Sequence, residues 1–258
     1  MLSRVMGLAR DVVFARVIGA DAFADVFFVA FKIPNFFRRL FAEGAFAQAF
    51  VPILGEYREK GSQAAVKELV NRVTGTLGIT LLGLTLIIVV ASPVMAAIFA
   101  PKWFFDEPDK FAATADMLRI TFPYLLFISM TGLAGGILNS YDRFAVPAFT
   151  PLLLNVTLIT AALVAAPLFD QPAFALAWGV FAAGVVQLMF QLPFLQRIHM
   201  LPRPKVDWQD AGVRKILALM GPAIFGVSVS QINLLLDTML ATFLPTGSVS
   251  WLYYSDRL

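Results

Sequence analysis

The amino-acid sequence predicts an all-α integral membrane protein, a polytopic bundle of helices that cross the bilayer several times. Apolar residues make up 59% of the 258 residues and charged residues only 14%, against about 45–50% and about 25% in soluble domains. Long stretches also lack any charge, and a bilayer-spanning helix needs about 20 mostly apolar residues. A soluble fold could not hide this much apolar surface, which excludes an ordinary cytosolic enzyme.

The charge-free stretches are continuous rather than alternating with period two, which favours helices over the strands of a membrane barrel. In the second half of the chain they are bounded by single charged residues such as Asp170 and Asp237. We expect about seven spans and the start of an eighth: 3–19, 23–54, 70–99, 115–139, 146–168, 173–196 and 214–244, with the eighth beginning near Ser248.

Polar segments with turn-forming residues separate these spans. Residues 101–110 form a predicted loop rich in proline and charge, residues 139–143 and 170–172 form short turns, and residues 197–210 form the longest loop. Alternate loops differ in charge. One set carries Arg58, Lys60, Lys67, Arg72, Arg143, Arg197, Arg203, Lys205, Arg214 and Lys215, whereas the other carries Lys102 and Lys110. By the positive-inside rule, the N-terminus is expected in the cytoplasm.

The first two spans contain charges that an apolar helix should lack, and each costs from about 2.5–3.5 kcal/mol upwards at membrane depth. At about 100° per residue, a single arc of the first helix holds Ser3, Arg4, Gly7, Arg10 and Asp11. One side of the second helix holds Asp25, Lys32, Arg39 and Glu43, and a kink at Pro34 lets Arg38 reach the same side. Such residues usually face a bundle interior or a water-filled cavity.

Two interpretations of these charges remain open. They could pair with one another to hold helices together, for instance Arg10 with Asp25 or Arg39 with Glu43. They could also line a cavity, and cations outnumber carboxylates in the two spans. A cavity of that charge suits an anionic ligand, and the planar guanidinium group binds phosphate oxygens in bidentate fashion.

Two further charged sites lie late in the chain. Asp237 stands alone in an apolar span and is either a helix-pairing residue or a cation or proton site. Asp256 and Arg257 follow Trp251 and Tyr254, a pattern that also fits an interfacial aromatic belt with a snorkelling arginine. The run from Gly132 to Gly136 is typical of a close helix contact.

Residues for other chemistry are lacking. The chain has no cysteine, its single histidine lies in a basic loop, and no phosphate-binding glycine loop, zinc motif or nucleophile elbow is present. We expect no metal, cofactor or catalytic residue, and hence no enzyme. The net charge of +3 gives no indication of nucleic-acid binding.

Several segments closely resemble the MurJ (MviN) family of lipid II flippases, in the multidrug/oligosaccharidyl-lipid/polysaccharide exporter superfamily. They are residues 3–57 with the motif NFFRRLFAEGAFAQAFVP, then ITFPYLLFISM, GPAIFGVSVSQINLLLDTML and SVSWLYYSDRL. The resemblance implies two lobes of six helices plus two extra. It also implies alternating access that moves undecaprenyl-pyrophosphate disaccharide-pentapeptide from the inner to the outer leaflet of the bacterial cytoplasmic (inner) membrane.

The resemblance also implies a division of the chain and a set of roles. Residues 1–200 would form the N-terminal lobe, with about six helices, and residues 201–258 a cytoplasmic linker and the first helices of a truncated C-terminal lobe. Asp237 falls where some members place a sodium ligand; H⁺ or the membrane potential could instead drive the cycle. Membrane lipids and the cell-wall synthesis machinery are the other implied partners. The implied substrate-binding residues are Arg4, Arg10, Arg38, Arg257, Asp25, Arg39 and Glu43, with Ser3 and Asp11 beside them.

Three other functions are alternatives to lipid II transport. A cation-coupled multidrug exporter, or an exporter of other polysaccharide lipids, belongs to the same superfamily, but a drug exporter would need a more acidic or aromatic cavity. An enzyme acting on polyprenyl phosphates would need acidic clusters or a nucleophile, and a scaffold for wall assembly would not need buried charge.

The resemblance implies more helices than this sequence contains, and the sequence ends inside the eighth span. We therefore expect the chain to be a fragment of a longer protein.

Overall fold

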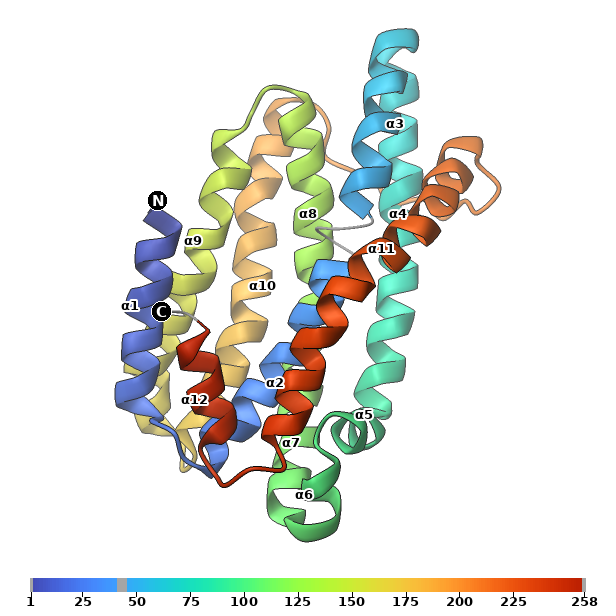
Figure 1. Ribbon diagram of the computed structural model, residues 1–258. Helices are drawn as coiled ribbons and strands as arrows, with labels where there is room; N and C mark the ends of the chain where they lie inside the picture. Colours follow the sequence, from blue (N-terminus) through green and yellow to red (C-terminus); the bar gives the residue numbers. More distant parts are fainter. Residues whose placement is uncertain (1, 41–45, 257–258) are drawn as a thin grey trace.

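The computed structural model describes residues 2–40 and 46–256, apart from the side chains of residues 2, 3, 229 and 230. The regular secondary structure of the described residues is helical throughout (Figure 1). The helices are α1 (Leu2–Val17), α2 (Ala22–Arg38), α3 (Phe46–Lys60), α4 (Gln63–Val90), α5 (Ser92–Phe99), α6 (Pro101–Asp106), α7 (Pro108–Thr121), α8 (Tyr124–Ser140), α9 (Ala145–Thr160, continued by irregular turns to Leu168), α10 (Pro172–Arg197), α11 (Ala211–Ala241) and α12 (Ser248–Ser255).

Five helical segments of the described chain are long and apolar enough to cross a membrane, judged by length and composition: Gln63–Val90, Pro108–Ser140, Ala145–Leu168, Pro172–Arg197 and Ala211–Ser228. The prediction of a multi-pass helical membrane bundle is therefore confirmed. Helices α1 and α2 are shorter, at 16 and 17 residues, and they carry the unusual charges.

Two expected segments were wrong. The expected span 70–99 is divided, since α4 ends at Val90 and α5 begins at Ser92. In the expected span 23–54, α2 reaches Arg38 and α3 begins at Phe46, and residues 41–45 lie outside the described residues. The expected loop 101–110 is also mostly helical, because Pro101 and Pro108 each occupy the first turn of a helix, where a missing N–H costs nothing.

The connections are sorted to the two ends of the bundle (Figure 1). One end carries the α3–α4 turn, the α8–α9 turn and the α10–α11 connection, which hold the lysine- and arginine-rich loops of the sequence. The other end carries the α1–α2 turn, α6 and the connection from α9 to α10. The two sets of loops that differ in charge thus lie at opposite ends of the molecule.

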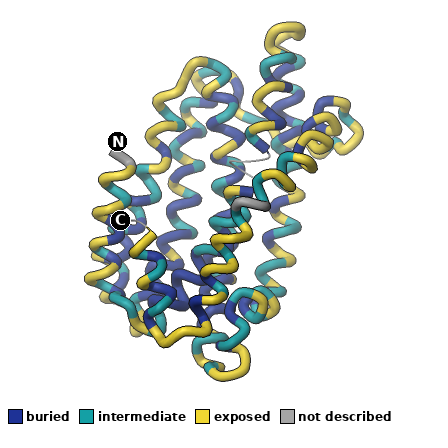
Figure 2. The backbone as a smooth tube through the Cα atoms, viewed as in Figure 1, coloured by how far each residue is buried: buried dark blue, intermediate teal, exposed yellow. Residues whose placement is uncertain are grey.

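An aromatic core fills the bundle toward the second of these ends, where Figure 2 shows buried backbone concentrated between α2, α7 and α10. The rings of Phe14 and Phe27 meet edge to face at 5.8 Å, and Phe28 stacks on Tyr253 of α12 at 4.1 Å. Edge-to-face and offset-stacked rings are favourable beyond the area they bury. This end of the bundle is therefore tightly packed.

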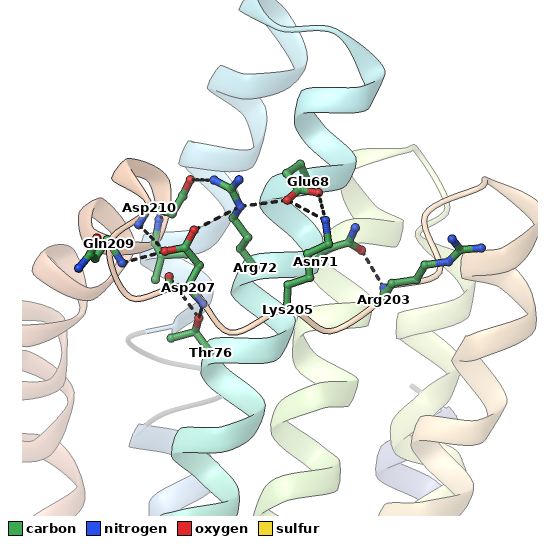
Figure 3. A network of polar contacts seen from close by, with 10 residues as sticks. Glu68, Asn71, Arg72, Thr76, Arg203, Lys205, Asp207, Gln209 and Asp210 are labelled. Atoms are coloured by element: carbon green, nitrogen blue, oxygen red, sulfur yellow. Dashed lines mark hydrogen bonds and ion pairs between the residues drawn. The ribbon is translucent and has the colours of Figure 1, made fainter.

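The connection between α10 and α11 is held against α4 by a polar network (Figure 3). We call residues 201–210 the strap. Arg72 of α4 bonds Glu68 on its own helix and forms ion pairs with Asp207 and Asp210 of the strap. Lys205 reaches back to Glu68 at 3.0 Å. Arg72 and Glu68 each have more than one charged partner, and such networks hold better than isolated surface pairs.

Backbone contacts bring the strap closer to α4 than side chains alone would allow. The side-chain oxygen of Asn71 accepts from the N–H of Arg203 at 2.7 Å, and its backbone oxygen accepts from the N–H of Lys205 at 3.0 Å. A Cβ added to Gly75 would lie 2.2 Å from the carbonyl oxygen of Lys205. Glycine at this position therefore permits the contact.

The start of α11 is fixed at two further points. Asp210 caps the helix by accepting from the N–H of Val213 at 3.0 Å. Lys215 donates to Glu56 of α3 at 2.6 Å. That hydrogen bond and the charge of Lys215 hold the pKa of Glu56 below its ordinary value, so the pair stays charged at neutral pH and is lost only on acidification.

We predict that Gly75→Ala displaces the strap, because the new methyl group would collide with the backbone of Lys205. The matched control is Gly78→Ala, one turn further along α4, where a Cβ would meet nothing within 4 Å. Both changes gain the same helix propensity. Limited trypsin digestion should cut after Lys205 several times faster in Gly75→Ala than in the control; equal rates would contradict the account.

Candidate functional site

A cavity of about 1080 Å³ lies among α1, α2, α3, α8, α9, α10, α11 and α12. Its lining comes from the C-terminal halves of α2 and α10, from about the first two-thirds of α1 and α9, and from α8 along its length. The start of α9 and the ends of α8 and α10 lie at the end of the bundle that carries the basic loops (Figure 1). The lining includes exposed residues such as Arg4 and Asn139, so the cavity is accessible from outside.

The described lining is cationic. It contains five cations and two carboxylates, those of Asp11 and Asp256, which leaves an excess of three positive charges. The cations all come from α1 and α2. They are Arg4, Arg10, Lys32, Arg38 and Arg39. The structure therefore brings together the charges of the first two helices around one hollow, with the second expected carboxylate, Asp25, elsewhere.

Arg10 is the most constrained of these cations. It is only 4% exposed, and its guanidinium donates to Asp11 at 2.6 Å, to Tyr253 at 2.9 Å and to Asn155 at 3.1 Å. Phe14 lies under the same group at 5.6 Å. A buried ion pair needs such additional hydrogen bonds to offset its desolvation. Arg10 pairs with its neighbour Asp11 rather than with Asp25.

Three other cations of the lining, Lys32, Arg38 and Arg39, donate to neutral polar side chains. Lys32 donates to the hydroxyl of Thr238 at 3.0 Å, and Arg39 donates to the amide oxygen of Gln231 at 3.2 Å. Both acceptors lie on α11, so two cations of α2 reach across to that helix. Arg38 donates to Asn35, one turn earlier on α2, at 3.1 Å. Each of these three contacts fixes the position of a cation through an uncharged acceptor.

The expected position of Asp25 on the cavity wall is wrong. Its carboxylate, 2% exposed, accepts from the N–H of Gly247 at 2.6 Å and from the N–H and hydroxyl of Ser250 at 2.8 and 2.6 Å. An anion is stabilised at a helix N-terminus by its unpaired N–H groups and dipole. We call this contact, at the tightly packed end of the bundle, the Asp25 clamp; it joins α2 to the start of α12.

The remaining expected residues lie apart from the described cavity wall or outside the description. Asp237 is exposed on α11 and does not line the cavity. No group of three or more potential metal-ligating side chains is found among the described residues. Glu43, Arg257 and the side chain of Ser3 fall outside the described residues.

Part of the wall was not expected from the sequence. Gly132 and Gly135 of α8 line the cavity, and Gly135 also makes the expected close helix contact, since a Cβ there would lie 3.4 Å from Pro147 of α9. Gln187 and Gln191 of α10 and Asn155 of α9 also line it. The four-residue spacing of the two glutamines, on one face of an otherwise apolar helix, is the signal that could have found them.

Fold and site together define a class: multi-pass helical membrane proteins with a cation-lined central cavity, suited to an anionic ligand. The family model described as "Lipid II flippase MurJ" matches residues 14–258. The chain belongs to this family.

Individual relatives agree. The chain is 53% identical to the "Probable lipid II flippase MurJ" of Haemophilus influenzae and 54% identical to that of Vibrio cholerae, in each case over 100% of this chain. A solved structure titled "Lipid II flippase MurJ, inward closed conformation" superposes with a TM-score of 0.81 at 26% identity, over 99% of this chain.

The chain spans about half the length of the relatives it matches. It covers 52% and 50% of the two curated proteins and 52% of the solved chain. The similarity therefore assigns the family and the fold of this half, and the activity of the whole protein is a matter for proposal.

We predict that Asp25→Asn destabilises the protein. The substituted amide presents its NH₂ group to donors of Gly247 and Ser250, leaving at least one buried donor without an acceptor, at about 1–3 kcal/mol. Thermal unfolding in detergent should begin several degrees lower than for Asp237→Asn, an equally conservative change at an exposed position. Identical unfolding of the two variants would show that the clamp does not hold α12.

Proposed function

We propose that this chain forms the N-terminal lobe, residues 1–200, and the first helices of the C-terminal lobe, residues 201–258, of a lipid II flippase. The substrate is the undecaprenyl-pyrophosphate-linked disaccharide-pentapeptide, and its diphosphate binds in the cationic cavity. The observation that carries the proposal is the excess of positive charge in a hollow formed by membrane-embedded helices, in a chain of the MurJ family.

The binding chemistry follows from the side chains present. Guanidinium groups donate in pairs to phosphate oxygens, and such charge-assisted bonds are roughly twice as strong as neutral ones. Arg4 and Arg38, from two helices, supply this chemistry on the wall, whereas Arg10 is already bonded to Asp11 and Tyr253. Arg10 then acts chiefly by positioning α12 and by its charge. Arg39 and Asp11 join this site, and Arg257, Glu43 and Ser3 belong to it by resemblance alone.

Transport is proposed to proceed by alternating access, with no bond made or broken. With the basic loops in the cytoplasm of a bacterial inner membrane, the N-terminus is cytoplasmic and the cavity admits substrate from the inner leaflet. The Asp25 clamp and the aromatic core close the opposite end. The lobes must separate there to release the headgroup outward, so the clamp opens once in each cycle, and Asp25 acts in gating rather than in binding.

The energy source and the partners belong to the same proposal. The membrane potential supplies about 2.3 kcal/mol per charge per 100 mV, and Na⁺ or H⁺ binding at Asp237 is a coupling route. Asp237 is exposed on α11, so the remaining helices of the proposed C-terminal lobe can contact it. Membrane lipids surround the bundle, and enzymes of cell-wall synthesis would supply and consume the substrate.

We predict that Arg4→Ala and Arg38→Ala each weaken binding of undecaprenyl pyrophosphate to the purified chain in lipid nanodiscs by about tenfold, the loss of one charge-assisted bond. Arg16→Ala is the matched control, because Arg16 is exposed on α1 and outside the cavity wall. Lys at position 38 should restore part of the affinity, since it keeps the charge but not the planar fork.

The same substitutions test transport in cells. A full-length MurJ relative whose first half is replaced by this chain should sustain growth after depletion of the resident flippase, and Arg38→Ala in that hybrid should not. Normal growth of each single arginine variant, together with unchanged binding of undecaprenyl pyrophosphate, would remove the proposed role of the cavity.

A further inference from the structure

The part of the cavity wall that α10 contributes has a chemistry of its own. Gln187 and Gln191 of α10 line the cavity but are only 2% and 1% exposed. Their NH₂ groups bind α9: Gln187 donates to the backbone oxygen of Thr150 at 3.1 Å, and Gln191 donates to the hydroxyl of Thr150 at 2.8 Å. Both side-chain carbonyl oxygens are buried and accept no hydrogen bond from the described residues.

The partners fix the direction of both amides. The backbone oxygen of Thr150 can only accept, so Gln187 must turn its NH₂ group toward it. The hydroxyl of Thr150 donates its hydrogen to the backbone oxygen of Val146 at 3.0 Å, which leaves it an acceptor for Gln191. Reversing Gln187 would set two acceptors against each other, and reversing Gln191 would require the Thr150 hydroxyl to give up its hydrogen bond to Val146. The two unpaired carbonyl oxygens are therefore a property of the packing between α9 and α10.

Glycine on α8 leaves the space beside the buried oxygen of Gln191 without a side chain from that helix. A Cβ on Gly135 would approach the Oε1 atom of Gln191 to 3.8 Å, and Gly132 lies one turn away on the same wall. Larger residues here would fill the space in front of the glutamine. A buried acceptor without a donor costs about 1–3 kcal/mol, and a ligand that supplies the donor recovers that cost.

We propose that Gln187 and Gln191 form an acceptor subsite that binds the uncharged part of the headgroup through its hydroxyl or amide N–H groups. This inference rests on the proposed function. The arginine wall only donates and selects an anion, whereas the glutamine oxygens only accept and select neutral donors. A headgroup with a diphosphate at one end and sugar hydroxyls, acetamido groups and peptide N–H groups at the other matches both walls of one cavity.

The test compares three probes on the purified chain in nanodiscs: lipid II, undecaprenyl pyrophosphate, and undecaprenyl-pyrophosphate disaccharide without the peptide. Gln187→Met and Gln191→Met remove the acceptors with little change in volume. Each should weaken lipid II binding by about three- to tenfold and leave undecaprenyl pyrophosphate binding unchanged. That unchanged affinity also shows that the variant is folded. Gln196→Met, at an exposed position on the same helix, is the control.

The outcomes separate the two proposals. A selective loss for lipid II supports the acceptor subsite, and a loss shared by the peptide-free probe assigns the contact to the sugars rather than to the peptide. Equal loss for lipid II and undecaprenyl pyrophosphate, or no loss for lipid II, overturns the subsite and leaves the arginine wall intact. Failure of the unsubstituted chain to bind either lipid overturns the proposed function, and the subsite with it.

Discussion

The cost of charge in a lipid bilayer governs this molecule. Two short helices carry five cations into an otherwise apolar bundle, and each would cost several kcal/mol against acyl chains. The structure meets this cost by directing the cations of α1 and α2 toward a single cavity. Three of these cations also have a fixed polar neighbour: Asp11 for Arg10, Thr238 for Lys32 and Asn35 for Arg38. The cavity is therefore a requirement of the sequence and also its functional site.

The two ends of the bundle are built differently around this hollow. Toward the basic loops, helices are held by ionic contacts on their surface, as between the strap and Arg72. Toward the other end they are held by stacked aromatic rings and by Asp25, whose buried carboxylate has three donors from α12. An alternating-access transporter has a state in which one end is open and the other is closed. The Asp25 clamp that closes one end here is small enough to break and reform.

The sequence alone predicted the spans, the sorting of the basic loops and the cations of the cavity, because charge and apolar length act locally and can be counted. It misplaced Asp25. The helical phase puts Asp25 on the same side of the second helix as Arg39, but it gives no information about the contact with α12, which lies more than 200 residues away in sequence. It missed Gln187 and Gln191 for the same reason: their role depends on which atoms of α9 occupy their NH₂ groups. The predicted close contact of the α8 glycines is present, at Gly135 against Pro147, but the sequence did not show that the same helix face also lines a cavity.

The central claim is that the hollow is water-filled and positively charged, and thiol labelling measures this directly. The chain has no cysteine, so Gly132→Cys places a single thiol on the cavity wall. The account predicts that a negatively charged methanethiosulfonate reagent reacts there much faster than a positively charged one of similar size, relative to their rates with a free thiol, and that undecaprenyl pyrophosphate slows the reaction. Equal rates for the two reagents, a faster positive reagent or an unreactive thiol would contradict it.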